Sequence, residues 1–181
     1  MELENLLKEI VAELDNLKIP YAFTGAIAAS FYGKPRTTHD FDVVISIKSG
    51  HGMAEKVVQA FYKDFYVSEE GIMDALIHKT MFNLIHHKTG MKIDLWILKE
   101  DAFSQEAFKR RKKGHFMGKI VYFLAAEDII LSKLLWYKEA ESDKHLKDIE
   151  GIIDIQDKIL DHKYLKNWAA KLGVSDLLSL S

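Results

Sequence analysis

The feature that most restricts the fold of this chain is a pair of short apolar segments in which aspartates alternate with apolar residues. Residues 40–47 read Asp-Phe-Asp-Val-Val-Ile-Ser-Ile, and this β-branched content is typical of a strand. Side chains two positions apart on a strand share one face, so Asp40 and Asp42 lie together, about 7 Å apart along the backbone. Phe41, Val43 and Ile45 point the other way. The sequence therefore predicts a strand with one face in the core and two carboxylates on the opposite face.

The second segment, residues 91–98, repeats this pattern around Asp94, because the apolar residues Ile93 and Leu95 flank it. If the two strands are neighbours, Asp94 lies about 5 Å from the Asp40/Asp42 pair. Three carboxylates at this distance repel one another and raise their own pKa values. A divalent cation is the simplest relief, and oxygen-only ligands favour Mg²⁺ or Mn²⁺. We therefore predict a metal site at these three aspartates.

A strand–glycine–helix unit precedes the carboxylates. Residues 21–24 are β-prone, Gly25 follows, and the small apolar run 26–32 suits a short helix that Gly33 ends. Such a turn offers backbone N–H groups to a phosphate, and a small residue at position 26 permits close approach. The segment is thus a candidate phosphate-binding turn beside the predicted metal site.

The rest of the chain predicts further strands and then only helices. Apolar spacings of three and four residues indicate an amphipathic helix over residues 3–17. The other expected elements are a second long helix over 53–65, a hairpin of strands 81–86 and 91–98, a helix over 102–111, a strand over 120–124, and helices over 126–139, 143–159 and 163–172. We expect an α/β (α+β) fold: a core over residues 1–125 and a helical extension over residues 126–181 packed on it.

Composition excludes several functional classes. With 181 residues the chain is expected to form one domain with a short extension. Lys and Arg total 25 and Asp and Glu total 27, so the chain lacks the strong positive charge of proteins that coat nucleic acid. The absence of Cys excludes thiolate metal sites and a Cys nucleophile. No run is long enough to span a bilayer and no signal peptide is visible at the acidic N-terminus, so we expect a cytoplasmic protein with no membrane partner.

These motifs resemble a known superfamily. The run Phe-Thr-Gly-Ala-Ile-Ala at 23–28, followed by Gly-Lys-Pro-Arg-Thr-Thr-His-Asp-Phe-Asp at 33–42, is similar to the nucleotidyltransferases related to DNA polymerase β. The Pro-Arg-x-Thr-x-Asp-x-Asp form resembles a small prokaryotic group that includes the AbiEii-type abortive-infection toxins. The stretch at 127–134 with Lys-Asp-Ile at 147–149 is similar to the helical motif of that group. The resemblance implies a nucleotidyltransferase-like mixed sheet flanked by helices, with a C-terminal helical segment.

The resemblance also implies an activity: transfer of a nucleoside monophosphate from a nucleoside triphosphate to a hydroxyl of an RNA, a protein or a small molecule. Asp40, Asp42 and Asp94 would be the catalytic and metal-binding residues, with Asp94 serving the acceptor. The nucleotide would contact Thr24, Gly25, Ala26, Arg36, Lys133 and Asp148. Lys133 is interpreted as a triphosphate clamp or as an ordinary lysine with a buried stem.

Two other functions stay open. Ala26 stands where the superfamily often has Gly or Ser, which fits a catalytically decayed nucleotide-binding or partner-binding module. The protein could also be the toxin of a toxin–antitoxin pair, with an antitoxin protein as its partner. A basic run could hold an RNA acceptor or be a solvated helix end. This run consists of Lys109, Arg110, Arg111, Lys112 and Lys113.

Three tryptophans and one adjacent histidine–aspartate pair complete the candidates. Trp96 shares a face with Asp94 and is interpreted as core packing, with stacking on a base as the alternative. Trp136 and Trp168 are interpreted as packing. The pair His39-Asp40 resembles the HD phosphohydrolase dyad, but it enters a strand rather than a helix, so we reject that interpretation.

Overall fold

The computed structural model describes residues 2–38, 40–47 and 52–178, so His39 lies outside the described residues. In this part of the chain a mixed sheet has the strand order β3-β4-β5-β2-β1-β7-β6. The central strand β2 runs parallel to β5 and antiparallel to β1, and β1 runs parallel to β7. The strands are β1 (Tyr21–Thr24), β2 (Asp40–Ile45), β3 (Phe65–Tyr66), β4 (Met81–His86), β5 (Lys92–Ile97), β6 (Lys112–Phe116) and β7 (Lys119–Phe123).

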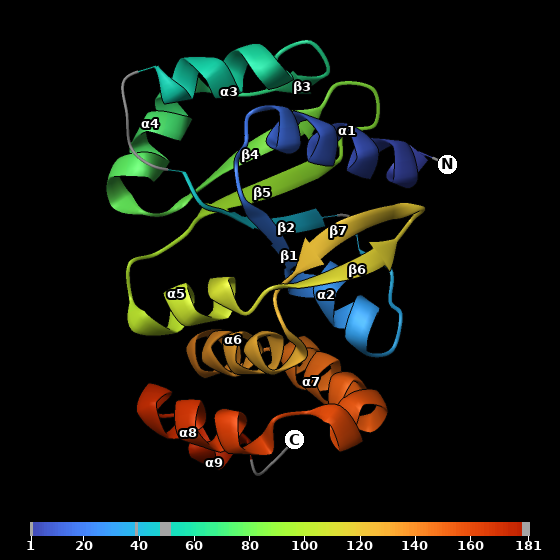
Figure 1. The fold of residues 1–181 in the computed structure, drawn as a ribbon, viewed down its shortest axis with the longest axis vertical. Coiled ribbons are helices and arrows are strands. Elements are labelled where there is room, and N and C mark those ends of the chain that lie inside the picture. Colours follow the sequence, from blue (N-terminus) through green and yellow to red (C-terminus); the bar gives the residue numbers. More distant parts are fainter. Residues whose placement is uncertain (1, 39, 48–51, 179–181) are drawn as a thin grey trace.

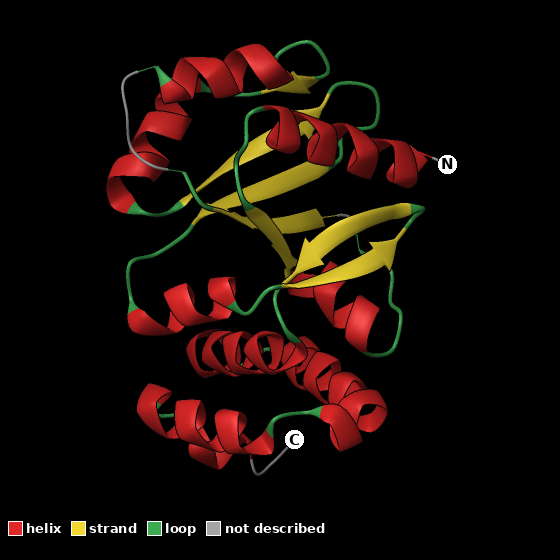
Figure 2. Ribbon diagram, viewed as in Figure 1, coloured by secondary structure: helices red, strands yellow, loops and turns green. Residues whose placement is uncertain are grey.

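Helices cover both sides of the sheet. Figure 1 shows α1, α3 and α4 on one side, whereas α5 to α9 gather on the other. The helices are α1 (Glu2–Asn16), α2 (Gly25–Tyr32), α3 (Met53–Phe61), α4 (Glu69–His78), α5 (Ala102–Lys109), α6 (Ala126–Ala140), α7 (Asp143–Gln156), α8 (His162–Leu172) and α9 (Ser175–Leu178), with a 3₁₀ turn at Asp157–Ile159. Strands and helices mix up to β7 and only helices follow, as predicted, and Figure 2 shows this last part as a group of helices without strands.

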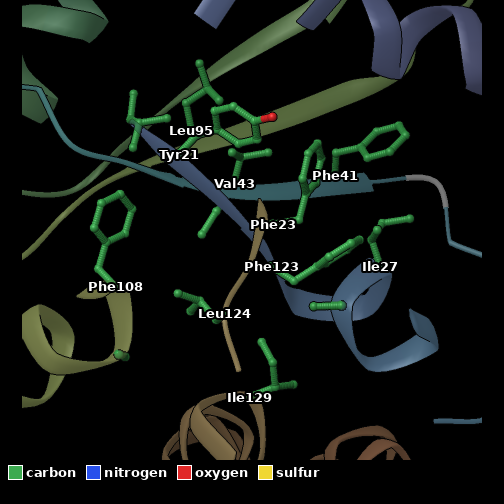
Figure 3. Close-up of a cluster of buried hydrophobic side chains, with 14 of the residues drawn as sticks. Tyr21, Phe23, Ile27, Phe41, Val43, Leu95, Phe108, Phe123, Leu124 and Ile129 are labelled. Atoms are coloured by element: carbon green, nitrogen blue, oxygen red, sulfur yellow. The ribbon is translucent and has the colours of Figure 1, made fainter. Parts of the chain in front are cut away.

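Alternation along β2 and β5 builds the core. Phe41 and Val43 on β2, with Ile93 and Leu95 on β5, are completely buried on the face away from the aspartates. Figure 3 shows the aromatic centre of this cluster, where the rings of Phe23 and Phe41 lie 6.1 Å apart. Residues of α6 and α8 belong to the same hydrophobic cluster as the sheet, so one continuous core crosses residue 125. The division into 1–125 and 126–181 stays a prediction.

Most predicted elements agree with the structure, including the hairpin of β4 and β5. The basic run at 109–113 does not end a helix throughout, because Lys112 and Lys113 begin β6. This strand pairs with β7 through a tight turn in which Met117 and Gly118 both have positive φ, 46° and 73°. The helix expected over 53–65 ends at Phe61, because Phe65 pairs with His86 of β4 and begins the short strand β3; helix α4 was missed. Among the described residues, no helix combines the length and apolar character needed to cross a membrane.

Candidate active site

Asp42 and Asp94 lie side by side on adjacent parallel strands. The register of β2 and β5 places Asp42 opposite Asp94 and Asp40 opposite Lys92. Phe41 and Ile93, the residues between, point into the core. The predicted arrangement, in which three carboxylates share one face of one sheet, is therefore present in the structure.

The three carboxylates differ in surroundings. Asp94 is 7% exposed, accepts a short hydrogen bond from the Asn83 side chain of β4, and pairs with Lys92 at 3.1 Å. Asp42 is half-buried and accepts a hydrogen bond of 3.2 Å from the indole N–H of Trp96. Asp40 is exposed at the start of β2. Asn83 and Trp96 are partners that the sequence reasoning did not assign, although their strand faces place them beside the aspartates.

Burial and charge repulsion act on Asp42. Its pKa is raised above the ordinary value, first by burial and then by the negative charges of Asp94 and Asp40, while the Trp96 hydrogen bond and the charge of Lys133 oppose the rise. Such a carboxylate favours a bound cation, and the oxygen donors suit Mg²⁺ or Mn²⁺. The carboxylates of Asp42 and Asp94 are engaged with neighbouring side chains, and within the described ranges no group of three acidic or histidine side chains is already gathered around one point. The donor chemistry therefore fits a divalent cation, because the Asp94 carboxylate keeps lone pairs beside those that Asn83 and Lys92 occupy.

Gly25 brings the candidate phosphate-binding turn against Asp42. Its φ is +62°, which disfavours other residues, and a Cβ placed on it would lie 2.0 Å from Asp42 Oδ2. Gly25 is the first residue of α2, and the residue before it, Thr24, makes no side-chain cap hydrogen bond. The N–H groups of the first helical turn have no partners within the helix, so they can bind an anion. The backbone of Gly25 and Ala26 is thus available directly beside a carboxylate of the candidate metal site.

Two cations converge on Asp148. Lys133 of α6 is 1% exposed, and its Nζ donates a 2.6 Å hydrogen bond to Asp148 on α7. The guanidinium of Arg36 donates to both carboxylate oxygens, at 2.7 and 3.0 Å. Burial raises the pKa of Asp148, but the hydrogen bonds from Arg36 and Lys133 outweigh it, so the pKa lies below the usual value. Burial lowers the pKa of Lys133, against the opposing effect of Asp148.

The close packing of α2 on α7 places Arg36 next to Asp148. A Cβ on Gly33 would lie 2.8 Å from the backbone carbon of Gly151, so the glycine at the end of α2 lets the two segments touch. The Gln156 side chain also donates to the backbone oxygen of Tyr32 at 2.9 Å. The loop that follows therefore places Arg36 at Asp148. Its predicted contact with a phosphate stays a prediction.

His145 is a neighbour of this cluster that sequence reasoning missed. It lies three residues before Asp148, on the same side of α7, and its ring centroid is 5.7 Å from that of Trp136. Its Nδ1 is buried and, among the described residues, has no hydrogen-bond partner. Burial and the nearby charge of Lys133 lower its pKa, which favours the neutral imidazole. The helical spacing to Asp148 was the signal that could have found it.

A cavity of about 300 Å³ opens beside the carboxylates. Thr24, Trp96, Ser132 and Trp136 belong to its wall, together with residues of α5. Trp96 and Trp136, both interpreted from the sequence as packing, therefore line a cavity next to the site. Trp168 packs against Phe103, with ring centroids 5.4 Å apart, in agreement with the sequence interpretation.

The basic run does not form a continuous surface. Arg110 pairs with Glu127 at 2.9 Å and with Asp128 at 3.3 Å, and its guanidinium lies 3.4 Å from the centre of the Tyr164 ring. Arg111 donates to the backbone oxygen of Phe108 at 2.9 Å. Lys109, Lys112 and Lys113 are exposed. Arg110 thus serves the packing of α5 against α6 and α8, whereas Arg111 binds the end of α5 itself.

Neither a protein-family model nor a curated protein sequence matches this chain. Solved structures do. An antigenic nucleotidyltransferase-like protein from Paracoccidioides brasiliensis matches with a TM-score of 0.66 and 22% identity, over 99% of this chain and 87% of that one. The chain has a nucleotidyltransferase-like fold.

Two antibiotic-modifying enzymes also share this fold. ANT(2'')-Ia, in complex with adenylyl-2''-tobramycin, has a TM-score of 0.65 and 14% identity, over 95% of this chain and 97% of that one. The lincosamide adenylyltransferase LnuA, bound to lincomycin, has a TM-score of 0.55 and 14% identity, over 86% and 98%. At these identities the likeness concerns the fold. The predicted mixed sheet flanked by helices is therefore confirmed.

Proposed function

We propose that this protein is a metal-dependent nucleotidyltransferase that transfers a nucleoside monophosphate from a nucleoside triphosphate to an acceptor hydroxyl. The observation that carries the proposal is the contact of Gly25 with Asp42, with Asp94 in register on the next strand. A phosphate-binding turn and a set of carboxylates thus meet at one point of a nucleotidyltransferase-like fold.

In this proposal the chain first positions the triphosphate. The N–H groups of Gly25 and Ala26 hold the β- and γ-phosphates at the start of α2, where the helix dipole favours negative charge. Lys133 and Arg36 together carry two positive charges against the one on Asp148, so this cluster of three residues has a net positive charge that suits a phosphate. Asp148 occupies one of the three N–H donors of Lys133, which leaves two for a phosphate.

Asp40, Asp42 and Asp94 would hold Mg²⁺ or Mn²⁺. A divalent cation bound there supplies Lewis-acid stabilisation of the attacking and the leaving oxygens. The acceptor oxygen forms a bond to the α-phosphorus, the bond to the β-phosphate oxygen breaks, and pyrophosphate leaves. Asp94 accepts the proton of the acceptor hydroxyl, since it is the carboxylate nearest to the open β4–β5 side of the sheet.

The proposal is tested by incubating the protein with each α-labelled nucleoside triphosphate, Mg²⁺ or Mn²⁺, and three acceptor pools: total RNA, cell protein and a panel of hydroxylated small molecules. Transfer of label that stops on adding a chelator supports it. Nucleotide binding without transfer to any pool favours the second candidate, a catalytically decayed binding module, for which Ala26 in the turn is the supporting observation. The RNA acceptor, the antitoxin partner and a place in the cytoplasm remain predictions.

A further inference from the structure

The cavity beside the carboxylates has a mainly apolar lining of aliphatic and aromatic side chains. Trp96 lies at one side, Trp136 at another, and Phe103 and Phe108 of α5 complete the aromatic lining. Two charged residues also border the cavity: Lys99, which is exposed, and Asp101, whose carboxylate caps α5 by accepting from the Ser104 N–H at 2.8 Å. Such a lining suits a flat, uncharged ring system rather than a phosphate or a polycationic sugar.

Residues adjacent in sequence to the proposed triphosphate contacts form part of the same cavity. Thr24 directly precedes Gly25, and Ser132 directly precedes Lys133. Trp136 lies one helical turn beyond Lys133, and the Lys133 Nζ is 5.7 Å from the centre of its indole ring. One face of α6 therefore presents a cation and then an aromatic ring, in the order in which a nucleotide presents its phosphates and then its base.

The partners of Asp94 lie on the β4–β5 part of the sheet and outside the cavity. Asn83 and Lys92, the partners of Asp94, are absent from the cavity wall, and they share the sheet face with Ile85, which is 39% exposed. The indole of Trp96 lines the cavity and donates to Asp42 at 3.2 Å, so it belongs to both the cavity and the carboxylate site. An acceptor can thus approach Asp94 over β4 and β5 without entering the cavity.

We infer that the cavity binds the base of the nucleoside triphosphate and favours a purine, an assignment that rests on the proposed function. The base stacks on the aromatic wall while its phosphates lie at Gly25 and Lys133. A bicyclic purine covers more of these rings than a pyrimidine does. The acceptor occupies the open face of β4 and β5.

Calorimetry tests this with ATP, inorganic tripolyphosphate and, for the purine preference, CTP, each with Mg²⁺ and no acceptor; equal binding of ATP and CTP overturns the preference. The wild type is expected to bind ATP more tightly than tripolyphosphate and more tightly than CTP. Trp136→Ala removes a stacking surface, and Ser132→Leu fills the cavity from α6. Each is expected to weaken ATP binding by about 5- to 150-fold, the effect of losing one base–aromatic stack, and tripolyphosphate binding by less than about twofold. Tyr66→Ala, which removes an exposed ring on β3, is the matched control and leaves both affinities unchanged.

The two probes ATP and tripolyphosphate separate this inference from the proposed function. If the wild type binds neither probe, the proposed nucleotidyltransferase activity fails and the inference fails with it. If tripolyphosphate binds but ATP binds no tighter, or both variants keep ATP affinity, the base assignment alone is overturned. An equal loss of both probes in both variants overturns it too. Ser132→Leu that binds ATP normally but no longer transfers label assigns the cavity to the acceptor instead.

Discussion

Lys133 and Asp148, fifteen residues apart, form a buried 2.6 Å ion pair between α6 and α7. The family resemblance implied that both residues contact a nucleotide, and the structure shows that they also bind each other. Arg36 completes the cluster from a loop more than a hundred residues earlier. The cluster therefore joins the proposed phosphate site to the helical segment, so substitutions in it act on both stability and binding.

Lys133→Met removes the buried ammonium but keeps most of the stem. Because Arg36 still pairs with Asp148, the free energy of unfolding is expected to fall by only about 1–3 kcal/mol. Tripolyphosphate binding weakens by about 1.5–3 kcal/mol, the contribution of a charge-assisted hydrogen bond. Urea unfolding and calorimetry measure the two effects, with Lys166→Met, an exposed lysine of α8, as control. Normal tripolyphosphate binding would make Lys133 purely structural and Arg36 the main phosphate contact.

Asp94→Asn separates transfer from binding. Its amide oxygen can still accept from Asn83, so the β4–β5 contact persists, but the proton acceptor is lost. Nucleotide affinity should change little while label transfer falls at least about a hundredfold, as expected for an interaction that acts in the transition state. Asp74→Asn on α4, an exposed aspartate, is the control. Full transfer by Asp94→Asn would show that this carboxylate has no catalytic part.

Metal binding should appear as stabilisation. Millimolar Mn²⁺ or Mg²⁺ is expected to raise the melting temperature of the wild type, because a ligand that binds only the folded state stabilises it. Asp42→Asn should abolish this gain. Without metal, this variant should be at least as stable as the wild type at pH 7, since the raised pKa of Asp42 means that its charged form is held unfavourably. Differential scanning fluorimetry with and without EDTA measures both effects, and an undiminished gain in the variant contradicts the ligand assignment.

The residues of the candidate site could largely be predicted from the sequence, because their positions follow from the local pattern of apolar and polar residues. Alternation in residues 40–47 and 91–98 fixes which face each aspartate takes, and a glycine between a strand and a small apolar run predicts the turn. The pairing of β2 with β5 follows the resemblance rather than any local signal. Local periodicity thus identified the residues, and the sheet register brought them together.

What sequence missed depends on contacts between distant segments. Nothing local to Arg36 indicates that two of its guanidinium nitrogens will donate to Asp148. This approach depends on the close packing of Gly33 against Gly151, which are far apart in the sequence. Arg110 looked like part of an exposed basic run, yet it packs under Tyr164. The β6–β7 turn at Met-Gly was overlooked because the charges before it resemble a helix end. In each case tertiary contacts outweigh the local pattern.

The junction of α5, α6 and α8 should respond to pH through Asp128. This carboxylate is fully buried, accepts a 2.6 Å hydrogen bond from Tyr164, and burial raises its pKa to about 6. An acid whose folded-state pKa exceeds its unfolded value is stabilising only while protonated, so this contribution is lost as pH rises from about 4 through about 6. Asp128→Asn should therefore gain up to about 3 kcal/mol relative to the wild type between pH 4 and 7. Urea unfolding across this range measures the difference, and a constant difference contradicts the shifted pKa.

Ala26→Ser tests whether the phosphate-binding turn has decayed or only changed. The added hydroxyl lies on the first turn of α2, where the backbone N–H is already available, and Ala26 is partly exposed, so the side chain has room. One further hydrogen bond to a phosphate contributes about 0.5–1.5 kcal/mol, which corresponds to roughly 2- to 12-fold tighter tripolyphosphate binding. Ala26→Val, which adds bulk without a donor, is the control and should bind no tighter. If Ala26→Ser gains affinity and label transfer rises with it, the wild-type site is a working one with a weaker phosphate grip. If affinity rises but neither protein transfers label to any acceptor pool, the binding-module alternative is the better description of this chain.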